Sequence, residues 1–156
     1  MSARRLIAES AEATRAIGAR LGEAARPRDV IALSGELGAG KTCFVQGLAV
    51  GLGVDEPVTS PTFILVAEHG GRLPLHHVDL YRIDGLEEMR ALGLEELFEG
   101  EGVTVVEWGE KAAPLLPSRT VHIRIHGVGD EPREIEIAGL SPERAARLRL
   151  DSSSRV

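Results

Sequence analysis

The sequence predicts a single α/β domain with a mixed, mostly parallel central sheet, flanked by helices and carrying a C-terminal β-hairpin. Three observations predict it. An apolar run at Val30–Leu33 leads through a glycine-rich segment into a stretch with helical spacing, where Phe44, Val45, Leu48 and Ala49 recur. Further strand-like runs alternate with helical stretches. Two pairs of runs separated by short glycine turns indicate antiparallel hairpins, so the sheet is expected to be mixed.

Length and composition fit one soluble domain. The 156 residues allow a sizeable core, and we expect the domain to span residues 1–150, with 151–156 as a flexible tail. The net charge of −6 argues against a protein that grips DNA or RNA by phosphate neutralisation alone. A single cysteine excludes an internal disulfide and suits a reducing compartment. No apolar run approaches membrane-spanning length, so a cytoplasmic protein without membrane contact is expected.

The first elements are a short strand and a helix. Leu6–Ala8 can form the strand. Ser10 can cap a helix that runs to about Ala25, with its apolar residues on one stripe, and Pro27 ends it.

The segment from Gly35 to Thr42 fits the pattern G-x-x-x-x-G-K-[ST], which predicts a P-loop NTPase-like domain. Gly38 and Gly40 can adopt positive φ, and a helix beginning near Lys41 would direct free N–H groups at phosphate. The lysine of such loops reaches the β- and γ-phosphates, and the hydroxyl of Thr42 would bind Mg²⁺. Only two lysines occur, against sixteen arginines, so Lys41 departs from the usual cation of this chain.

A polar loop and a hairpin come next. Thr59–Phe63 carries groups able to bind oxygen or position water. The runs Phe63–His69 and Leu73–Leu80 flank Gly70-Gly71 and predict a hairpin, with Asp79 near its end. His69, His76 and His77 suggest zinc, but adjacent strand residues point to opposite faces and no further ligand completes a tetrahedral set.

A broken helix and a buried strand lead to a second acid. Leu86–Leu97 reads as helical with an interruption at Gly93. Val103–Val106 is a buried-type strand that ends at Glu107. A carboxylate at the carboxyl end of such a strand suits a metal in a nucleotide site, although an exposed glutamate is a plain alternative.

The last elements are a half-exposed hairpin and a short helix. Val121–Ile125 and Glu134–Ile137 alternate apolar and charged residues across Gly127–Asp130. Ser141 then begins an arginine-bearing helix.

Four motifs in a fixed order resemble the bacterial TsaE family, the ATPase component of the machinery that makes threonylcarbamoyladenosine in tRNA. They are Gly35–Thr42, Thr59-Ser60-Pro61-Thr62-Phe63, His77-Val78-Asp79-Leu80-Tyr81-Arg82 and Val106-Glu107-Trp108-Gly109-Glu110. The likeness spans about Val30 to Lys111. It implies slow hydrolysis of ATP with Mg²⁺ in a cycle with two partner proteins, TsaD and TsaB, of which TsaD transfers the threonylcarbamoyl group. It also implies that tRNA is reached indirectly, through the complex.

The resemblance also implies roles for residues. Lys41, Asp79 and Glu107 would be catalytic, with Thr42 and Glu107 on Mg²⁺ and Asp79 beside the γ-phosphate. The implied nucleotide-binding set is Glu36, Leu37, Gly38, Ala39, Gly40, Lys41, Thr42, Cys43 and Trp108. Thr59–Thr62 resembles a switch-like loop. The chain departs from relatives at His69, where tyrosine is frequent, and at Gly109, where proline or alanine is frequent.

The motifs leave other functions open. No motif clearly supplies a positive charge for the transition state; Arg82 is a candidate, but a surface ion pair explains it as well. The expected ATPase activity is therefore weak in the isolated protein and completed by the partners. A small-molecule kinase with Arg144, Arg147 and Arg149 on a lid is one alternative. A nucleotide-dependent assembly module is another. GTP is disfavoured because no Asn-Lys-x-Asp segment is present.

Overall fold

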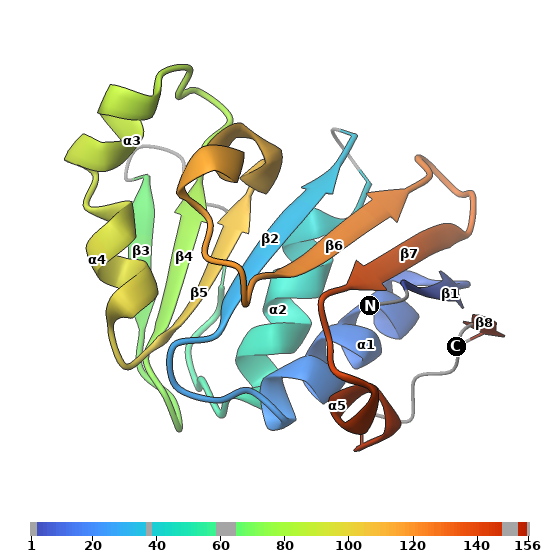
Figure 1. Ribbon diagram of the computed structural model, residues 1–156. Helices are drawn as coiled ribbons and strands as arrows, with labels where there is room; N and C mark the ends of the chain where they lie inside the picture. Colours follow the sequence, from blue (N-terminus) through green and yellow to red (C-terminus); the bar gives the residue numbers. More distant parts are fainter. Residues whose placement is uncertain (1–2, 37–38, 59–64, 148–152, 156) are drawn as a thin grey trace.

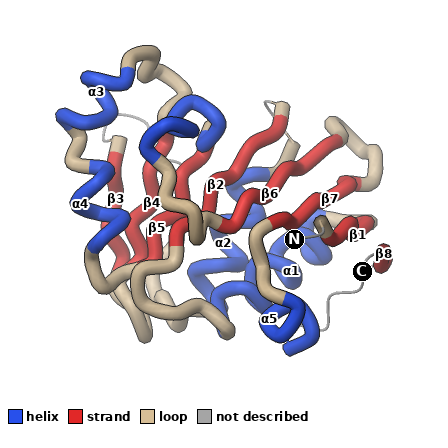
Figure 2. Tube along the Cα trace, viewed as in Figure 1, coloured by secondary structure: helices blue, strands red, loops and turns tan. Residues whose placement is uncertain are grey.

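A computed structural model describes residues 3–36, 39–58, 65–147 and 153–155 (Figures 1 and 2). The strands are β1 (Arg4–Ala8), β2 (Val30–Gly35), β3 (Val66–His69), β4 (Leu75–Asp79), β5 (Val103–Glu107), β6 (Val121–His126), β7 (Arg133–Ala138) and β8 (Ser153–Arg155). The helices are α1 (Ala11–Glu23), α2 (Lys41–Gly51), α3 (Leu86–Ala91), α4 (Leu94–Glu99), the 3₁₀ helix η1 (Gly109–Leu115) and α5 (Pro142–Arg147).

Within the described residues the strands form one sheet in the order β3-β4-β5-β2-β6-β7-β1-β8. The four strands β4, β5, β2 and β6 run parallel at its centre, whereas β3 and β7 are antiparallel to their neighbours. The predicted mixed, mostly parallel sheet is confirmed. Because parallel strands end at the same edge, β2, β4 and β5 deliver their last residues side by side (Figure 1).

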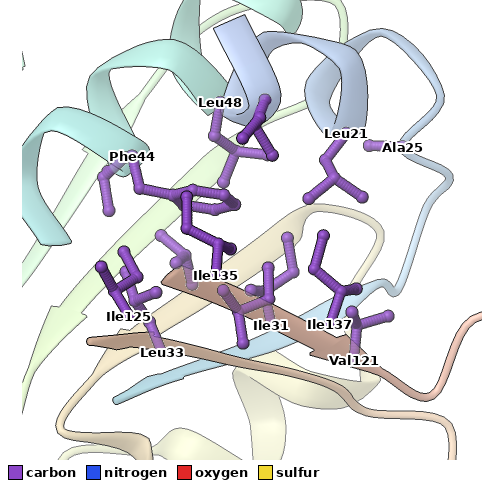
Figure 3. Close-up of a cluster of buried hydrophobic side chains, with 14 of the residues drawn as sticks. Leu21, Ala25, Ile31, Leu33, Phe44, Leu48, Val121, Ile125, Ile135 and Ile137 are labelled. Carbon is purple, nitrogen blue, oxygen red and sulfur yellow. The ribbon is translucent and has the colours of Figure 1, made fainter. Parts of the chain in front are cut away.

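Alternating side chains place the sheet between two apolar layers. Leu33 and Val105 belong to the cluster that includes the inner sides of α1 and α2 (Figure 3). Val30 and Val106 face the opposite way, toward α3, α4 and η1. The central strands are buried on both faces, which explains their nearly continuous apolar sequences.

Four glycines bring α1 and α2 into backbone contact. Gly18 and Gly22 lie on α1, and Gly47 and Gly51 lie on α2, each pair one helical turn apart. A Cβ atom built on any of them would lie 2.0–2.4 Å from a carbonyl oxygen of the other helix. The two helices therefore approach more closely than side chains would allow, and α2 is held tightly at the position from which it presents its first turn.

Most predicted elements are present near their expected boundaries. Ser10 caps α1, since Ala13 N donates to its Oγ at 3.1 Å. Gly93, at φ 78°, separates α3 from α4 where the interruption was predicted. The C-terminal hairpin is confirmed as β6 and β7. The 3₁₀ helix η1 was not predicted, because its short sequence with an internal Pro114 carries no helical period.

The C-terminal end contributes one more strand to the sheet. Ser153–Arg155 form β8, which pairs in parallel with β1 at Arg5, Leu6 and Ile7. Without this partner β1 would be a sheet edge with unpaired N–H and C=O groups, which can pair with any strand of suitable direction. A polar serine-rich segment gives no periodic signal of such pairing, because the bonds are made by its backbone. The domain boundary at residue 150 and the flexibility of residues 151–156 stay predictions.

Candidate functional site

The site begins where β2 turns into α2. Gly35 has φ 151°, and a Cβ there would lie 2.5 Å from the carbonyl oxygen of Ile125 on β6. Gly40, the N-cap of α2, has φ 102°, as expected for this loop, and no side chain caps the helix. Leu37 and Gly38 lie outside the described residues. A helix N-terminus without a side-chain cap is a favourable place for an anion.

Lys41, the first residue of α2, is turned inward. Its Nζ donates to the carbonyl oxygens of Gly35 at 2.6 Å and Glu36 at 3.2 Å. The ammonium also lies 4.0 Å from the ring centroid of Trp108. Burial lowers the pKa of Lys41, and the nearby carboxylates, Glu107 foremost, oppose that shift. The result is a desolvated cation held by carbonyl oxygens and an indole face, which an anion can engage strongly.

The two predicted acids meet across neighbouring strands. Asp79 and Glu107 are register partners, each the last residue of its strand. Glu107 is only 3% exposed, which removes the exposed-glutamate alternative. Glu107 lies two residues after Val105 and so on the same face of β5, the face that packs toward α2, and its register partner Asp79 shares that face. Both acids therefore face the start of α2.

The electrostatics of Asp79 reflect this proximity. Burial, and then the charge of Glu107, raise the pKa of the Asp79 carboxyl. A hydrogen bond from Tyr81 N to Oδ1, at 3.0 Å, opposes the shift. Asp79 is therefore a carboxylate whose proton affinity is increased, first by burial and then by Glu107, a property suited to orienting or deprotonating water.

His77 makes a contact that sequence reasoning missed. Its Nε2 lies 2.5 Å from Oε2 of Glu107, and both side chains are buried. The sequence raised His77 as a zinc candidate and as the first residue of a motif that resembles the TsaE family, and it predicted no contact with Glu107. No group of three or more His, Cys, Asp or Glu that could hold a metal is found in the part of the chain that the structure describes. The two-residue spacing of His77 and Asp79 was the available signal, because it places both on one face of β4.

An aromatic pair borders the site. Trp108 follows Glu107 in the left-handed region, at φ 59°, and its ring lies 5.1 Å from that of Tyr81. Lys111 donates to the carbonyl oxygens of Tyr81 and Ile83 at 2.9 and 3.1 Å, which fixes the segment after β4. Gly109 is required, since a Cβ there would lie 2.7 Å from that of Ala32. The turn after β5 can thus lie directly on β2.

A polar pocket of about 250 Å³ adjoins the start of α2. Gly40 and Cys43 line one side, and Ser10 lies just before α1. Asp130 comes from the β6–β7 connection, and Arg133 is the first residue of β7. Arg133 Nε donates to Ala39 O at 2.9 Å and so ties β7 to the loop. The sequence indicated only Gly40 and Cys43 of this lining, because the walls come from three segments far apart in the chain.

The comparisons with known proteins agree with this arrangement. The family described as "Threonylcarbamoyl adenosine biosynthesis protein TsaE" matches residues 8–135. The chain belongs to the TsaE family. This confirms the family expected from the order of the motifs.

Individual TsaE relatives resemble the chain over most of its length. The TsaE protein of Treponema pallidum is 46% identical over 134 residues, covering 86% of this chain and 99% of the relative. That of Bacillus subtilis is 46% identical over 125 residues, with 80% and 78% covered. Among solved structures, the crystal structure of Bacillus subtilis YdiB superposes with a TM-score of 0.76 at 36% identity, covering 95% of this chain and 93% of that chain.

Other residues expected for a TsaE site fall in different places. Thr42 is partly buried, one residue into α2. Arg82 is exposed, and Thr59–Phe63 lie outside the described residues.

Arg144, which the kinase alternative placed on a lid, binds Asp29 at 2.6 Å. Asp29 lies just before β2 begins and thus at the opposite end of the sheet from Lys41. This position speaks against the lid of a small-molecule kinase.

No helix among residues 3–36, 39–58, 65–147 and 153–155 is both long and apolar enough to span a bilayer.

Proposed function

We propose that this chain is a Mg²⁺-dependent ATPase of tRNA threonylcarbamoyladenosine biosynthesis, the process named in the descriptions of its relatives. One observation carries the proposal. A buried lysine begins an uncapped helix, and it faces two acids at the ends of adjacent parallel strands. Phosphoryl transfer requires this combination of anion-binding N–H groups, a cation and carboxylates for a metal and for water.

The donor set fits a magnesium ion bound together with ATP. Asp79 and Glu107 would repel a triphosphate unless a cation lay between them, because both are carboxylates placed beside Lys41. Mg²⁺ is commonly held by one or two carboxylates, with phosphate oxygens and waters completing its shell. Thr42 and Glu107 would be the protein ligands. Bound magnesium would neutralise charge on the phosphates as the terminal P–O bond breaks.

Other groups of the chain would bind the phosphates, the attacking water and the nucleoside. The first turn of α2 would bind the phosphates through its N–H groups. Lys41 would exchange its carbonyl contacts at Gly35 and Glu36 for phosphate oxygens. Asp79 would orient the attacking water. The pocket beside Gly40 and Cys43 lies next to the phosphate site, so it is the space we assign to the nucleoside.

Membership of the TsaE family supports partner proteins for this chain. We expect slow turnover by the isolated protein, and activation by TsaD-like and TsaB-like proteins that complete the charge arrangement around the phosphates, as added arginines do in other P-loop systems. Contact with tRNA would be indirect, through that complex. A pathway directed at tRNA and the single cysteine support a cytoplasmic location.

Two substitutions test the proposal. Lys41→Ala is expected to lower ATP affinity at least 10-fold, because it removes the phosphate cation. Glu107→Gln is expected to reduce hydrolysis about 100-fold and to weaken the dependence on Mg²⁺. Arg90→Ala on exposed α3 is the control and should match wild type. Binding is measured by calorimetry and turnover by phosphate release.

Two results would contradict the proposal. Turnover by the isolated protein at tens per second would refute the dependence on partners. Unchanged Mg²⁺ dependence in Glu107→Gln would remove this residue from the metal site. If wild type binds its partners equally well with ATP and with a non-hydrolysable analogue, and does not hydrolyse ATP, the assembly-module alternative is favoured instead.

A further inference from the structure

The buried histidine His77 contacts Glu107 through one ring nitrogen, and its other ring nitrogen has no partner among the described groups. His77 is 0% exposed in the centre of the β4–β5 region, and its Nε2 meets Glu107 Oε2 at 2.5 Å. Its other ring nitrogen, Nδ1, is buried and has no hydrogen-bond partner among the described groups. Burying a polar atom without a partner destabilises the folded state. A purely apolar side chain would fill the same space without that cost, so packing alone does not explain the histidine.

The contact fixes one oxygen of the carboxylate. An ionised carboxylate only accepts hydrogen bonds, so His77 must donate through Nε2–H. Oε2 is then engaged, and the second oxygen of Glu107 remains for another ligand. Residues that ligate metals are commonly oriented by such outer hydrogen bonds, and loss of the outer partner weakens metal affinity 10–100-fold.

The competing partner of Glu107 is Lys41. Among the charges that act on the Lys41 ammonium, Glu107 is the strongest attractive one. If the carboxylate turned fully toward the ammonium, the metal ligand and the phosphate cation would neutralise each other. The hydrogen bond from His77 gives Glu107 a second partner that holds the carboxylate in place.

We infer that His77 is a positioning residue: it holds Glu107 apart from Lys41, with one carboxylate oxygen directed to magnesium. The inference rests on the proposed function, since it assigns the orientation of the metal ligand in that same site. His77 itself contacts neither nucleotide nor metal in this scheme.

Three substitutions of His77 separate this role from simple packing. His77→Leu removes the donor at similar size. His77→Gln places an amide nitrogen near the position of Nε2 and keeps the donor, whereas His77→Asn is too short to reach it. His76→Leu is the matched control, because His76 is the adjacent residue on the opposite face of β4 and is partly buried.

The main readout is the affinity for a non-hydrolysable ATP analogue with and without Mg²⁺, measured by calorimetry. Mg²⁺ is expected to raise the affinity for the analogue about 10-fold less in His77→Leu than in wild type. The affinity without Mg²⁺ should change less than 2-fold. His77→Gln should recover most of the loss, and His76→Leu should match wild type. In turnover assays the Mg²⁺ concentration for half-maximal rate should rise about 10-fold in His77→Leu, with KM for ATP unchanged at saturating Mg²⁺.

The outcomes are distinguishable. If wild type binds Mg·ATP and the His77→Leu variant shows the same Mg²⁺ dependence as wild type, the inference is overturned and the proposed function stands. Wild type without Mg²⁺-dependent binding overturns both. If His77→Leu does not fold, as judged by circular dichroism, His77→Gln and His77→Asn decide: equal losses in these two overturn the inference, and a loss confined to His77→Asn supports it.

Discussion

Replacing Gly47 by alanine tests whether the close contact of α1 and α2 stabilises the fold. The new Cβ would lie 2.0 Å from the carbonyl oxygen of Arg15 and 2.8 Å from its Cα. Both are backbone atoms, so no side chain can rotate away. To reach 3.4 Å, where ordinary contact begins, the helices would have to separate by 1.4 Å along this direction.

The magnitude follows from two opposing effects. Overpacking of this kind destabilises by about 1–3 kcal/mol, and more where backbone must move. Alanine is favoured over glycine inside a helix by about 1 kcal/mol. Because the clash involves only backbone, we take the upper end of the first range and expect a net loss of about 2 kcal/mol in the free energy of unfolding.

Urea unfolding followed by circular dichroism measures this loss as a lower midpoint at unchanged slope. The control is Gly70→Ala, an exposed glycine at which a Cβ would meet no atom within 4 Å. It should stay within about 0.5 kcal/mol of wild type. A Gly47→Ala protein as stable as wild type would refute the reasoning, since it would mean that the helices can separate freely.

Two further predictions concern charged groups. Because the folded pKa of Asp79 is raised above 3.8, the folded state binds its proton more tightly than the unfolded state, and stability falls as pH rises through that window. Asp79→Asn, which can still accept from Tyr81, should therefore be more stable than wild type at pH 7. This advantage should shrink on acidification toward pH 3.8, and an advantage independent of pH in urea unfolding would contradict the assignment. Arg144→Ala should lower the free energy of unfolding by about 2 kcal/mol, since it leaves the half-buried Asp29 without its cation. Arg90→Ala, which removes an exposed ion pair, should change the free energy of unfolding by less than about 0.5 kcal/mol. Equal effects of Arg144→Ala and Arg90→Ala would contradict the stabilising role of Arg144.

The parts of the site that were predictable from sequence lie on single elements. The glycine-rich turn, Lys41 and the acid after an apolar strand each have a local pattern, because strand and helix periods and special backbone angles are set by near neighbours. The break at Gly93 and both hairpins were predictable for the same reason.

The parts that were missed depend on strand register and on contacts between distant segments. The distance between His77 and Glu107 follows from the alignment of β4 with β5, which no short segment encodes. The pocket that includes Arg133 requires β7 to lie beside the loop before α2. The glycine contacts were visible as four-residue spacings, but their meaning required knowing that α1 packs on α2.

The strand order has a consequence for synthesis of the chain. β1 ends at Ala8 and finds its antiparallel partner only in β7, which begins at Arg133, about 125 residues later. At roughly 5–20 residues per second, the ribosome needs on the order of 6–25 s to deliver that partner. During this interval the apolar face of the first strand has no place in the sheet. Nascent chains should therefore present it to chaperones until translation is nearly finished, and fragments that end before β7 should aggregate.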